Sequence, residues 1–402
     1  MIESLTLHDW DPAAALPYAA GGLDTLFAEL RDTAPVHRQP GTAGTPDIWL
    51  VTRYDDCARV LKDAASFGSE RGNGLSTLLG GGDPAGGMML AVTDGERHSA
   101  LRKLIMRAFT PRFIDTMRER VARDADDRVA RYIDSGATDF ARDISDLVPV
   151  TVICDMFEIP PGDRAELLEL TGSALSADHE SDAAAGNSAK GELLFYFADL
   201  IESRRGRGDD SLLGLLTSET VQGRPLSDEE IMVNCYSLLL AGDETSRLAI
   251  SGAVAALIEH ESQWEALCSG AVSVDDAVEE VLRWTTPTAH AARTATVPAE
   301  LGGHRVEPGD IVTVWKLSAN RDERQFTDPF TFDLGRSPNR HLSFAHGPHY
   351  CLGAFLARME IASVLTALRN RVRAIEFRDH PEPLYSNFFH GYRTMPVELI
   401  PR

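Results

Sequence analysis

Apolar residues recur at three- to four-residue spacing along much of the chain. This spacing places them on one face of a helix, and it predicts helices over residues 94–109, 113–135, 163–175, 191–205 and 227–260. At the start of the last range, Ser227 stands three residues before Glu230, the spacing of a capping box that satisfies two backbone donors. The pattern therefore predicts a mainly helical protein with one long helix through its middle.

Runs that favour β-strands are short and few. They cover residues 48–52, 294–298 and 311–315, and a turn-forming stretch at 307–310 separates the last two. The glycine-rich segment 68–87 predicts a loop, and segment 320–341 predicts an ordered polar meander. Since neither an internal repeat nor a long linker divides the chain, we expect one domain over residues 1–402, in the α+β class, mainly α with small sheets.

Composition and charge narrow the choice of partners and compartment. The 402 residues are 43% hydrophobic and 25% charged, which is typical of a globular protein with a large core. A formal net charge of −22 disfavours nucleic acid and anionic membrane surfaces as partners. The first ten residues contain neither a basic leader nor an apolar run, and the five cysteines are widely spaced. We therefore expect a cytoplasmic protein with reduced thiols and no membrane partner.

One cysteine has surroundings that suit metal ligation. It lies in the segment FAHGPHYCLG, Phe344–Gly353, which precedes a helical pattern from Ala354 to Arg371. A helix start lowers the pKa of a thiol, a metal ion holds it deprotonated, and Gly347 lets the backbone approach a flat group closely. Taken alone, Cys351 could equally be an ordinary buried thiol.

The pattern FxxGxxxCxG, in this position near the end of the chain, resembles the haem-binding loop of the cytochrome P450 family. The resemblance implies a haem-thiolate protein with haem b (iron protoporphyrin IX), Cys351 as the iron ligand, and Phe344 and Gly353 among the cofactor-binding residues. It also implies the family's triangular-prism fold, with the long central helix over the haem.

Further motifs of this family occur in its order along the chain. Ala241-Gly242-Asp243-Glu244-Thr245, in the middle of the long helix, resembles the oxygen-activation motif. The resemblance implies catalytic roles for Ala241, Gly242, Glu244 and Thr245, with Thr245 orienting oxygen and water and Glu244 delivering protons. The alternative is a Gly/Thr kink at a helix–helix contact.

Two more sets of residues follow from the resemblance. Glu280 and Arg283 match a buried ExxR pair, completed by Arg336, that supports the haem loop; without the resemblance they would be an ordinary exposed helix pair. Four residues match the cations that hold the haem propionates: His98, Arg102, Arg293 and His349. The chain departs from the usual pattern at Ala345, where glycine is common, and at His349, where arginine is common. We expect neither departure to weaken haem binding, since an alanine only reduces backbone freedom and a histidine still donates a hydrogen bond.

Positions that match the family's substrate contacts predict a mostly apolar pocket. These positions are Met89, Leu90, Ser237, Leu238, His290, Ala291, Phe388 and Phe389, with Met88, Thr288 and His390 as further candidates. Each could equally pack in the core, although a histidine in an apolar cavity could orient a polar group of the substrate. The fold does not choose the substrate.

The resemblance implies a monooxygenase that inserts one oxygen atom from O2 into a small molecule, free or tethered to a carrier protein, in secondary metabolism. Electrons would come from NAD(P)H through ferredoxin reductase and ferredoxin, because the chain has no reductase domain or cluster-binding cysteines. The basic residues Arg102, Lys103, Arg107 and Arg112 would dock the ferredoxin. The alternatives are oxidative C–C or C–N coupling, desaturation, and a non-catalytic haem sensor or recruitment protein.

Overall fold

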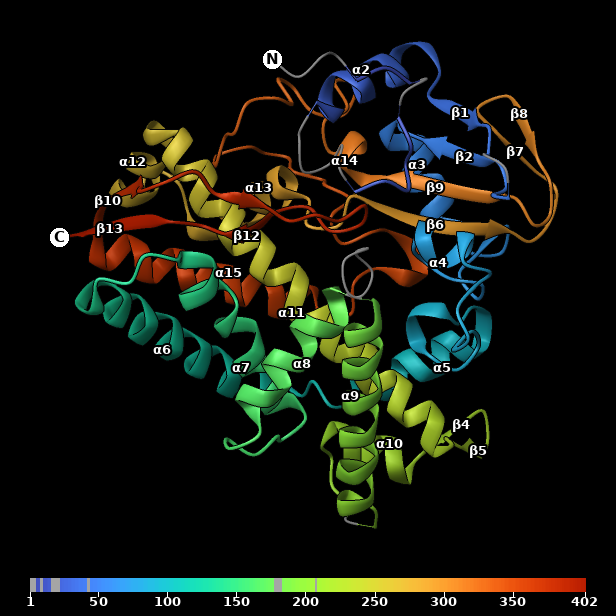
Figure 1. Ribbon diagram of the computed structural model, residues 1–402, viewed down its shortest axis with the longest axis horizontal. Coiled ribbons are helices and arrows are strands. Elements are labelled where there is room, and N and C mark those ends of the chain that lie inside the picture. Colours follow the sequence, from blue (N-terminus) through green and yellow to red (C-terminus); the bar gives the residue numbers. More distant parts are fainter. Residues whose placement is uncertain (1–4, 8–9, 16–21, 42–43, 177–182, 207) are drawn as a thin grey trace.

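The computed structural model describes residues 5–7, 10–15, 22–41, 44–176, 183–206 and 208–402 (Figure 1). Its helices are α2 (Leu23–Thr33), α3 (Tyr54–Lys62), α4 (Leu75–Leu79), α5 (Gly95–Met106), α6 (Pro111–Ser135), α7 (Leu147–Met156), α8 (Arg164–Ser176), α9 (Ala183–Arg204), α10 (Leu212–Ser218), α11 (Asp228–Glu259), α12 (Glu261–Ser269), α13 (Val274–Thr285), α14 (Lys316–Ala319) and α15 (Ala354–Arg371). The mainly α architecture with small sheets is confirmed. No helix within the described ranges is long and apolar enough to cross a membrane.

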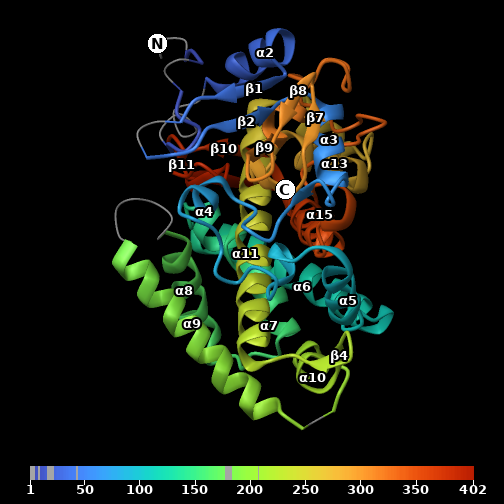
Figure 2. The same cartoon turned by 90° about the vertical axis from the view of Figure 1, so that its right-hand side faces the viewer.

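The long central helix forms as predicted. α11 spans 32 residues and begins at the predicted capping box, where the Ser227 hydroxyl accepts from the Glu230 backbone N–H at 3.2 Å and the Ser227 N–H donates to the Glu230 carboxylate at 2.8 Å. In Figure 2 this helix runs through the middle of the molecule, between the sheet at one end and α8, α9 and α10 at the other. Side chains of α11 pack with those of α5, α6, α7, α13 and α15 in the largest hydrophobic core.

The main sheet has five strands in the order β1 (Val36–Gln39), β2 (Ile48–Val51), β9 (Ile311–Trp315), β6 (His290–Ala295) and β3 (Phe67–Gly68). β2 and β9 pair in parallel, and both are buried along their whole length, as their continuous apolar runs predict. Beside the sheet lies a second core, in which Trp10 packs against Phe27 and Trp315 with ring centroids 5.6 and 5.1 Å apart. The other strands form two-stranded ribbons: β4 (Thr220–Val221) with β5 (Arg224–Pro225), β7 (Ala299–Leu301) with β8 (His304–Val306), β10 (Val372–Phe377) with β13 (Val397–Pro401), and β11 (Glu382–Pro383) with β12 (Tyr392–Thr394).

Two local predictions were wrong. The strand expected at 294–298 lies at His290–Ala295, because its pairing with β9 sets its register, with His290 opposite Trp315. The glycine-rich segment is not a plain loop, since Gly68 of β3 pairs with Thr294 of β6 and Leu75–Leu79 form α4. In both places tertiary pairing overrides the local propensity. The predicted ranges did not include helices α2, α3, α7, α10 and α12. Segment 320–341 is an irregular meander, as predicted.

Candidate active site

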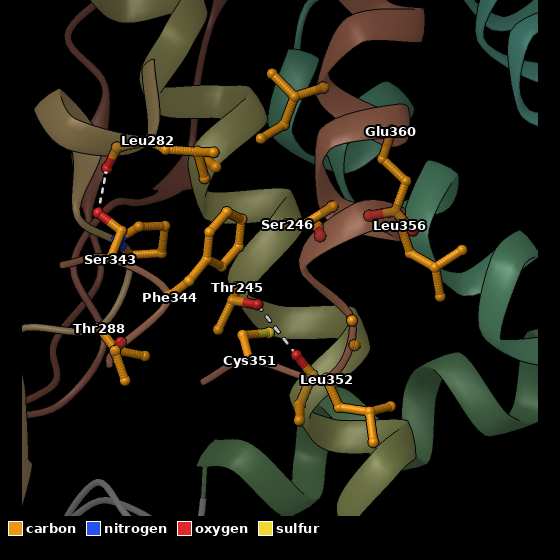
Figure 3. A pocket seen from close by; sticks show the side chains of 18 of the residues that line it. Thr245, Ser246, Leu282, Thr288, Ser343, Phe344, Cys351, Leu352, Leu356 and Glu360 are labelled. Carbon is orange, nitrogen blue, oxygen red and sulfur yellow. Dashed lines mark hydrogen bonds between the residues drawn. The ribbon is translucent and has the colours of Figure 1, made fainter. Parts of the chain in front are cut away.

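A mostly apolar cavity lies between α11 and α15 (Figure 3). Its walls come from α7, α11, α13, α15, the segment after α13 and the loop before α15. The lining residues are Phe109, Ile153, Met156, Leu238, Ala241, Gly242, Thr245, Ser246, Ala249, Leu282, Pro287, Thr288, Lys316, Ser343, Phe344, Ala345, His349, Cys351, Leu352, Gly353, Leu356, Ala357, Glu360 and Ile361. The cavity thus brings together two motifs that lie about a hundred residues apart in the chain, with Thr245 on one wall and Cys351 on the other.

The loop that carries Cys351 is folded back on itself before α15 begins. The Cys351 N–H donates to the Phe344 carbonyl at 2.9 Å. Burial raises the pKa of the Cys351 thiol, and it is opposed by a hydrogen bond from the Gly353 backbone and by the positive charges of Lys316 and Arg102. An iron ion would hold such a thiol in its deprotonated form, so the donors and cations around the sulfur suit a thiolate ligand.

Backbone geometry in this loop explains why residue 347 is a glycine and shows that the backbone of Ala345 is strained. Gly347 has φ +72°, and a β-carbon there would stand 2.7 Å from Lys62 Cα of α3, so no side chain fits between the loop and α3. Ala345 has φ +59°, in the left-handed region. An L-residue in that region is strained by roughly 1–2 kcal/mol. The expectation that alanine at this position only reduces backbone freedom was therefore incomplete, because Ala345 also strains the loop.

Buried cations and donors next to this loop have few partners among the described residues. The His98 ring on α5 stacks on the His349 ring with centroids 4.2 Å apart, and its Nε2 has no hydrogen-bond partner among the described residues. Burial, with the charge of His349, lowers the pKa of His98 to about 4. His349 Nε2 lies 2.8 Å from an Asp94 oxygen. The only hydrogen bond that the buried Arg293 makes within the described residues is to the Ala292 carbonyl, at 2.7 Å.

This donor set fits the acidic side chains of an iron porphyrin. An orphaned imidazole nitrogen and a buried guanidinium without a carboxylate partner need an anion to satisfy them. The propionates of haem b supply two carboxylates, and the cysteine in the same cavity supplies the ligand for the iron. The residues present therefore fit haem b as the cofactor.

The polar motif of α11 has one residue in the cavity and one behind it. Thr245 lines the cavity, and its hydroxyl donates to the Ala241 carbonyl one turn earlier, at 3.0 Å. Glu244 is buried and faces away from the cavity, where it accepts from Arg247 Nε at 2.8 Å; Arg247 in turn donates to Asp146 at 3.3 Å.

Gly242 marks a close contact between two helices. A β-carbon at Gly242 would stand 2.2 Å from the end of the Ile153 side chain on α7, so that side chain would have to shift. α11 is helical without a break through the motif, so the helix–helix contact that we gave as an alternative is present, whereas its kink is not.

The ExxR residues form a buried network with the meander. The Glu280 carboxylate accepts two hydrogen bonds from Arg283, at 2.7 and 2.8 Å, and one from Arg336 at 3.1 Å. Arg283 is fully buried and also donates to the carbonyls of Asn320 and Pro329. The network thus joins α13 to the irregular segment that leads to the cysteine loop, which agrees with the supporting role that the resemblance implies.

Most of the predicted substrate residues lie outside the cavity. Within the described part of the chain, Leu238 is the one residue of that set that lines it, along with the further candidate Thr288. His290 packs in the core instead: its ring is tilted against Trp315 and meets Phe388 edge to face, and its Nε2 accepts from the Leu75 backbone N–H at 3.1 Å.

The other predicted positions have comparable packing roles. Leu90 is buried in the core, and Phe389 packs on Phe388 with ring centroids 5.0 Å apart. Met89, Ser237 and Ala291 are also absent from the cavity wall, and His390 is tied to the Thr285 carbonyl at 2.7 Å. The role of these residues in substrate contact stays a prediction.

Three ionisable groups near the cavity were not predicted. Lys316 and Glu360 line it, and Asp243 lies behind it on α11. Burial raises the pKa of Glu360 to about 8 against a hydrogen bond with Ser246, and burial raises the pKa of Asp243 to about 8 as well. A charged residue at the end of a buried strand, as Lys316 is, was the one signal in the sequence that could have drawn attention to it.

A cysteine and a hydroxyl-bearing helix that share one mostly apolar cavity are the arrangement of a haem-thiolate protein, and comparisons with known proteins agree. The cytochrome P450 family model matches residues 273–384. The chain is 41% identical to cytochrome P450 NovI of Streptomyces niveus over 394 residues, 98% of this chain and 97% of that protein. It is 34% identical to a methyl-branched lipid omega-hydroxylase of Mycobacterium tuberculosis over 390 residues, 93% of this chain and 90% of that protein.

A solved structure gives the same answer. The crystal structure of P450 OxyD, which is involved in the biosynthesis of vancomycin-type antibiotics, superposes with a TM-score of 0.88 at 33% identity, covering 98% of this chain and all of that one (100%). The chain belongs to the cytochrome P450 family. It is therefore an oxygen-incorporating oxidoreductase that uses haem b, O2 and electrons derived from NAD(P)H.

Proposed function

We propose that this cytochrome P450 hydroxylates or epoxidises a mostly apolar small molecule of secondary metabolism, with electrons delivered by ferredoxin and ferredoxin reductase. The observation that carries the proposal is the shared cavity, in which Cys351 and Thr245 stand on facing walls lined mainly by apolar side chains. The similarity to OxyD, whose printed role is in antibiotic biosynthesis, supports the metabolic setting.

The chain's own residues divide the work. Haem b, when bound, supplies oxygen activation and the oxidation of the substrate. In this proposal Cys351 ligates the iron, Phe344 and Gly353 shape the loop around it, and His98, Arg102, Arg293 and His349 hold the propionates. The apolar side chains of Leu238, Ile153 and Met156 exclude water and hold the substrate over the porphyrin.

Proton supply is assigned to the α11 motif. We place Thr245 as the residue that donates a hydrogen bond into the cavity, which requires its hydroxyl to turn from the Ala241 carbonyl. Glu244 relays protons: Arg247, itself paired with Asp146, holds the carboxylate until it rotates away, takes up a proton from solvent and passes that proton toward Thr245. A Thr245→Ala variant should keep consuming NAD(P)H but release hydrogen peroxide in place of product, with Ser218→Ala as a control on a hydroxyl remote from the cavity.

The decisive experiment is spectroscopic and then isotopic. Dithionite-reduced protein under carbon monoxide should show a strongly red-shifted Soret band that Cys351→Ala lacks. Turnover under ¹⁸O2 is then followed by mass spectrometry, with terpenes, polyketides and aromatic amino acids as substrates, each offered free and as a carrier-protein thioester. Gain of one labelled oxygen supports the proposal. Loss of two hydrogens indicates coupling or desaturation, and a haem-loaded protein that consumes no NAD(P)H with any substrate would indicate the non-catalytic alternative.

We also propose that the basic patch near α5 docks the ferredoxin. Lys103, Arg107 and Arg112 are exposed, although Arg107 is paired with Glu219 at 2.9 Å. Charge reversal of Lys103 and Arg112 should slow electron transfer from reduced ferredoxin, and more so at low salt. Reversal of Arg142, an exposed arginine in the segment Ala141–Ser145 that packs on β12, is the control. Equal transfer rates in the patch variant and the wild type would contradict the proposal.

A further inference from the structure

A lysine in the cavity wall has no role in the proposed function. Lys316 begins α14 directly after β9, and its side chain is almost completely buried. Its ammonium donates to the Thr288 hydroxyl, which is its one hydrogen-bond partner in the described part of the chain, and no ion pair joins it to a carboxylate there. A buried ammonium that has only a neutral hydroxyl as its partner is costly, because a single hydroxyl does not replace its hydration.

Charges of both signs act on Lys316. Burial lowers the pKa of the Lys316 ammonium to about 8; the Cys351 thiol opposes this shift, and Arg293 adds to it. Burial also lowers the pKa of Arg293, to about 10, with Asp94 as the only charge that opposes it. Asp94 is already occupied by His349 and by the backbone N–H of Ser69.

We infer that Lys316 binds a carboxylate inside the cavity and is a further anchor for a haem propionate, beyond the four residues proposed above. The inference rests on the proposed function in one respect only: it requires that haem b is the cofactor. Position supports the inference, because Lys316 lines the same cavity as Cys351 and His349.

The same chemistry could come from the carboxylate of a substrate, because Lys316 and its partner Thr288 both line the cavity. The propionate is favoured because of Arg293. Arg293, one of the proposed propionate residues, acts on the Lys316 ammonium and lowers its pKa, so an anion bound by both cations in every functional state, such as a resident cofactor, stabilises them best.

The test uses Lys316→Met, which keeps the unbranched stem of the side chain out to the ε position and removes the ammonium. The matched control is Lys190→Met, at an exposed lysine on α9. In one arm, haem loss to an excess of apomyoglobin is timed for each holoenzyme. A charge-assisted hydrogen bond to a propionate predicts that Lys316→Met loses haem about ten- to a hundred-fold faster than the wild type, while Lys190→Met does not. The propionate bending bands in the resonance Raman spectrum should shift in Lys316→Met alone.

The second arm distinguishes a substrate carboxylate. The Soret shift is titrated with dodecanoate and with its methyl ester, using wild type and Lys316→Met. Loss of a preference for the acid, with haem loss and Raman bands unchanged, would keep Lys316 as a carboxylate-binding residue and assign its anion to the substrate.

Unchanged haem loss, Raman bands and acid preference would overturn the inference and leave Lys316 with the structural role of holding Thr288. Thr288→Val gives a second variant should Lys316→Met fold poorly, since it leaves the ammonium in place and removes only the hydroxyl. It should leave haem loss within about two-fold of the wild type if the propionate is the main partner. If Lys316→Met keeps the red-shifted carbon monoxide band, Cys351 remains the iron ligand regardless of the results on haem loss, Raman bands and acid preference.

Discussion

Neutralising Glu280 should destabilise the protein far more than an ordinary surface substitution. Its carboxylate is fully buried and accepts five hydrogen bonds: two from Arg283 and one each from Arg336, Asn339 and the backbone N–H of Asp333. In Glu280→Gln one oxygen becomes an NH2 group that faces these donors, and the two arginines lose their counter-charge. Breaking a buried ion pair in this way costs about 3–5 kcal/mol of the free energy of unfolding.

The measurement is guanidinium unfolding of wild type and Glu280→Gln, with Glu265→Gln on the exposed face of α12 as the matched control. Hydrogen exchange provides the local readout. Amides of segment 320–341 should exchange faster in Glu280→Gln, because Arg283 and Arg336 hold the carbonyls of that segment only while Glu280 positions them. A loss below about 1 kcal/mol with unchanged exchange there would refute the reasoning, since that is the range of exposed pairs.

Three further predictions follow from the geometry of the site. Ala345→Gly should raise the free energy of unfolding by about 1 kcal/mol, because it relieves the left-handed backbone; a lower thermal midpoint would contradict this. Gly242→Ala should destabilise the protein through the contact with Ile153, and Ile153→Val should recover part of the loss in the double mutant, whereas additive losses would point to another cause. Burial raises the pKa of Glu279, but hydrogen bonds from Arg358 and His341 outweigh it and lower the pKa to about 2. The stability that Glu279 contributes is therefore present above about pH 4.5 and is lost as the pH falls toward 2, so the acid unfolding curve of Glu279→Gln should be flatter in that window.

How much of the fold could be predicted depended on where each signal resides in the chain. α11 and α15 could be placed because their caps and apolar spacing are local, and α15 begins and ends at the predicted residues Ala354 and Arg371. β3 could not be placed from the sequence, because this two-residue strand exists only through its pairing with Thr294 and Ala295 of β6. A local pattern carries no information about such a partner.

The site divides in the same way. Cys351, Thr245 and the Glu280–Arg283–Arg336 contact could be predicted because each belongs to a motif with fixed spacing or a matching position in the family. The residues that line the cavity around the substrate could not be predicted in this way. His290 sits on a strand whose alternation decides which face it occupies, and Trp315 and Phe388 hold it in the core. Lys316 escaped notice for the same reason, since its direction into the cavity is set by the end of β9 and the turn into α14.

The close approach of Gly347 to Lys62 has a consequence for biosynthesis. The cysteine loop is supported on one side by α3, which is synthesised well before it. This contact joins residues nearly three hundred positions apart, so it contributes strongly to contact order. The loop that carries the iron ligand is therefore seated only after both α3 and the loop have been made, and we expect haem to be captured after that contact forms.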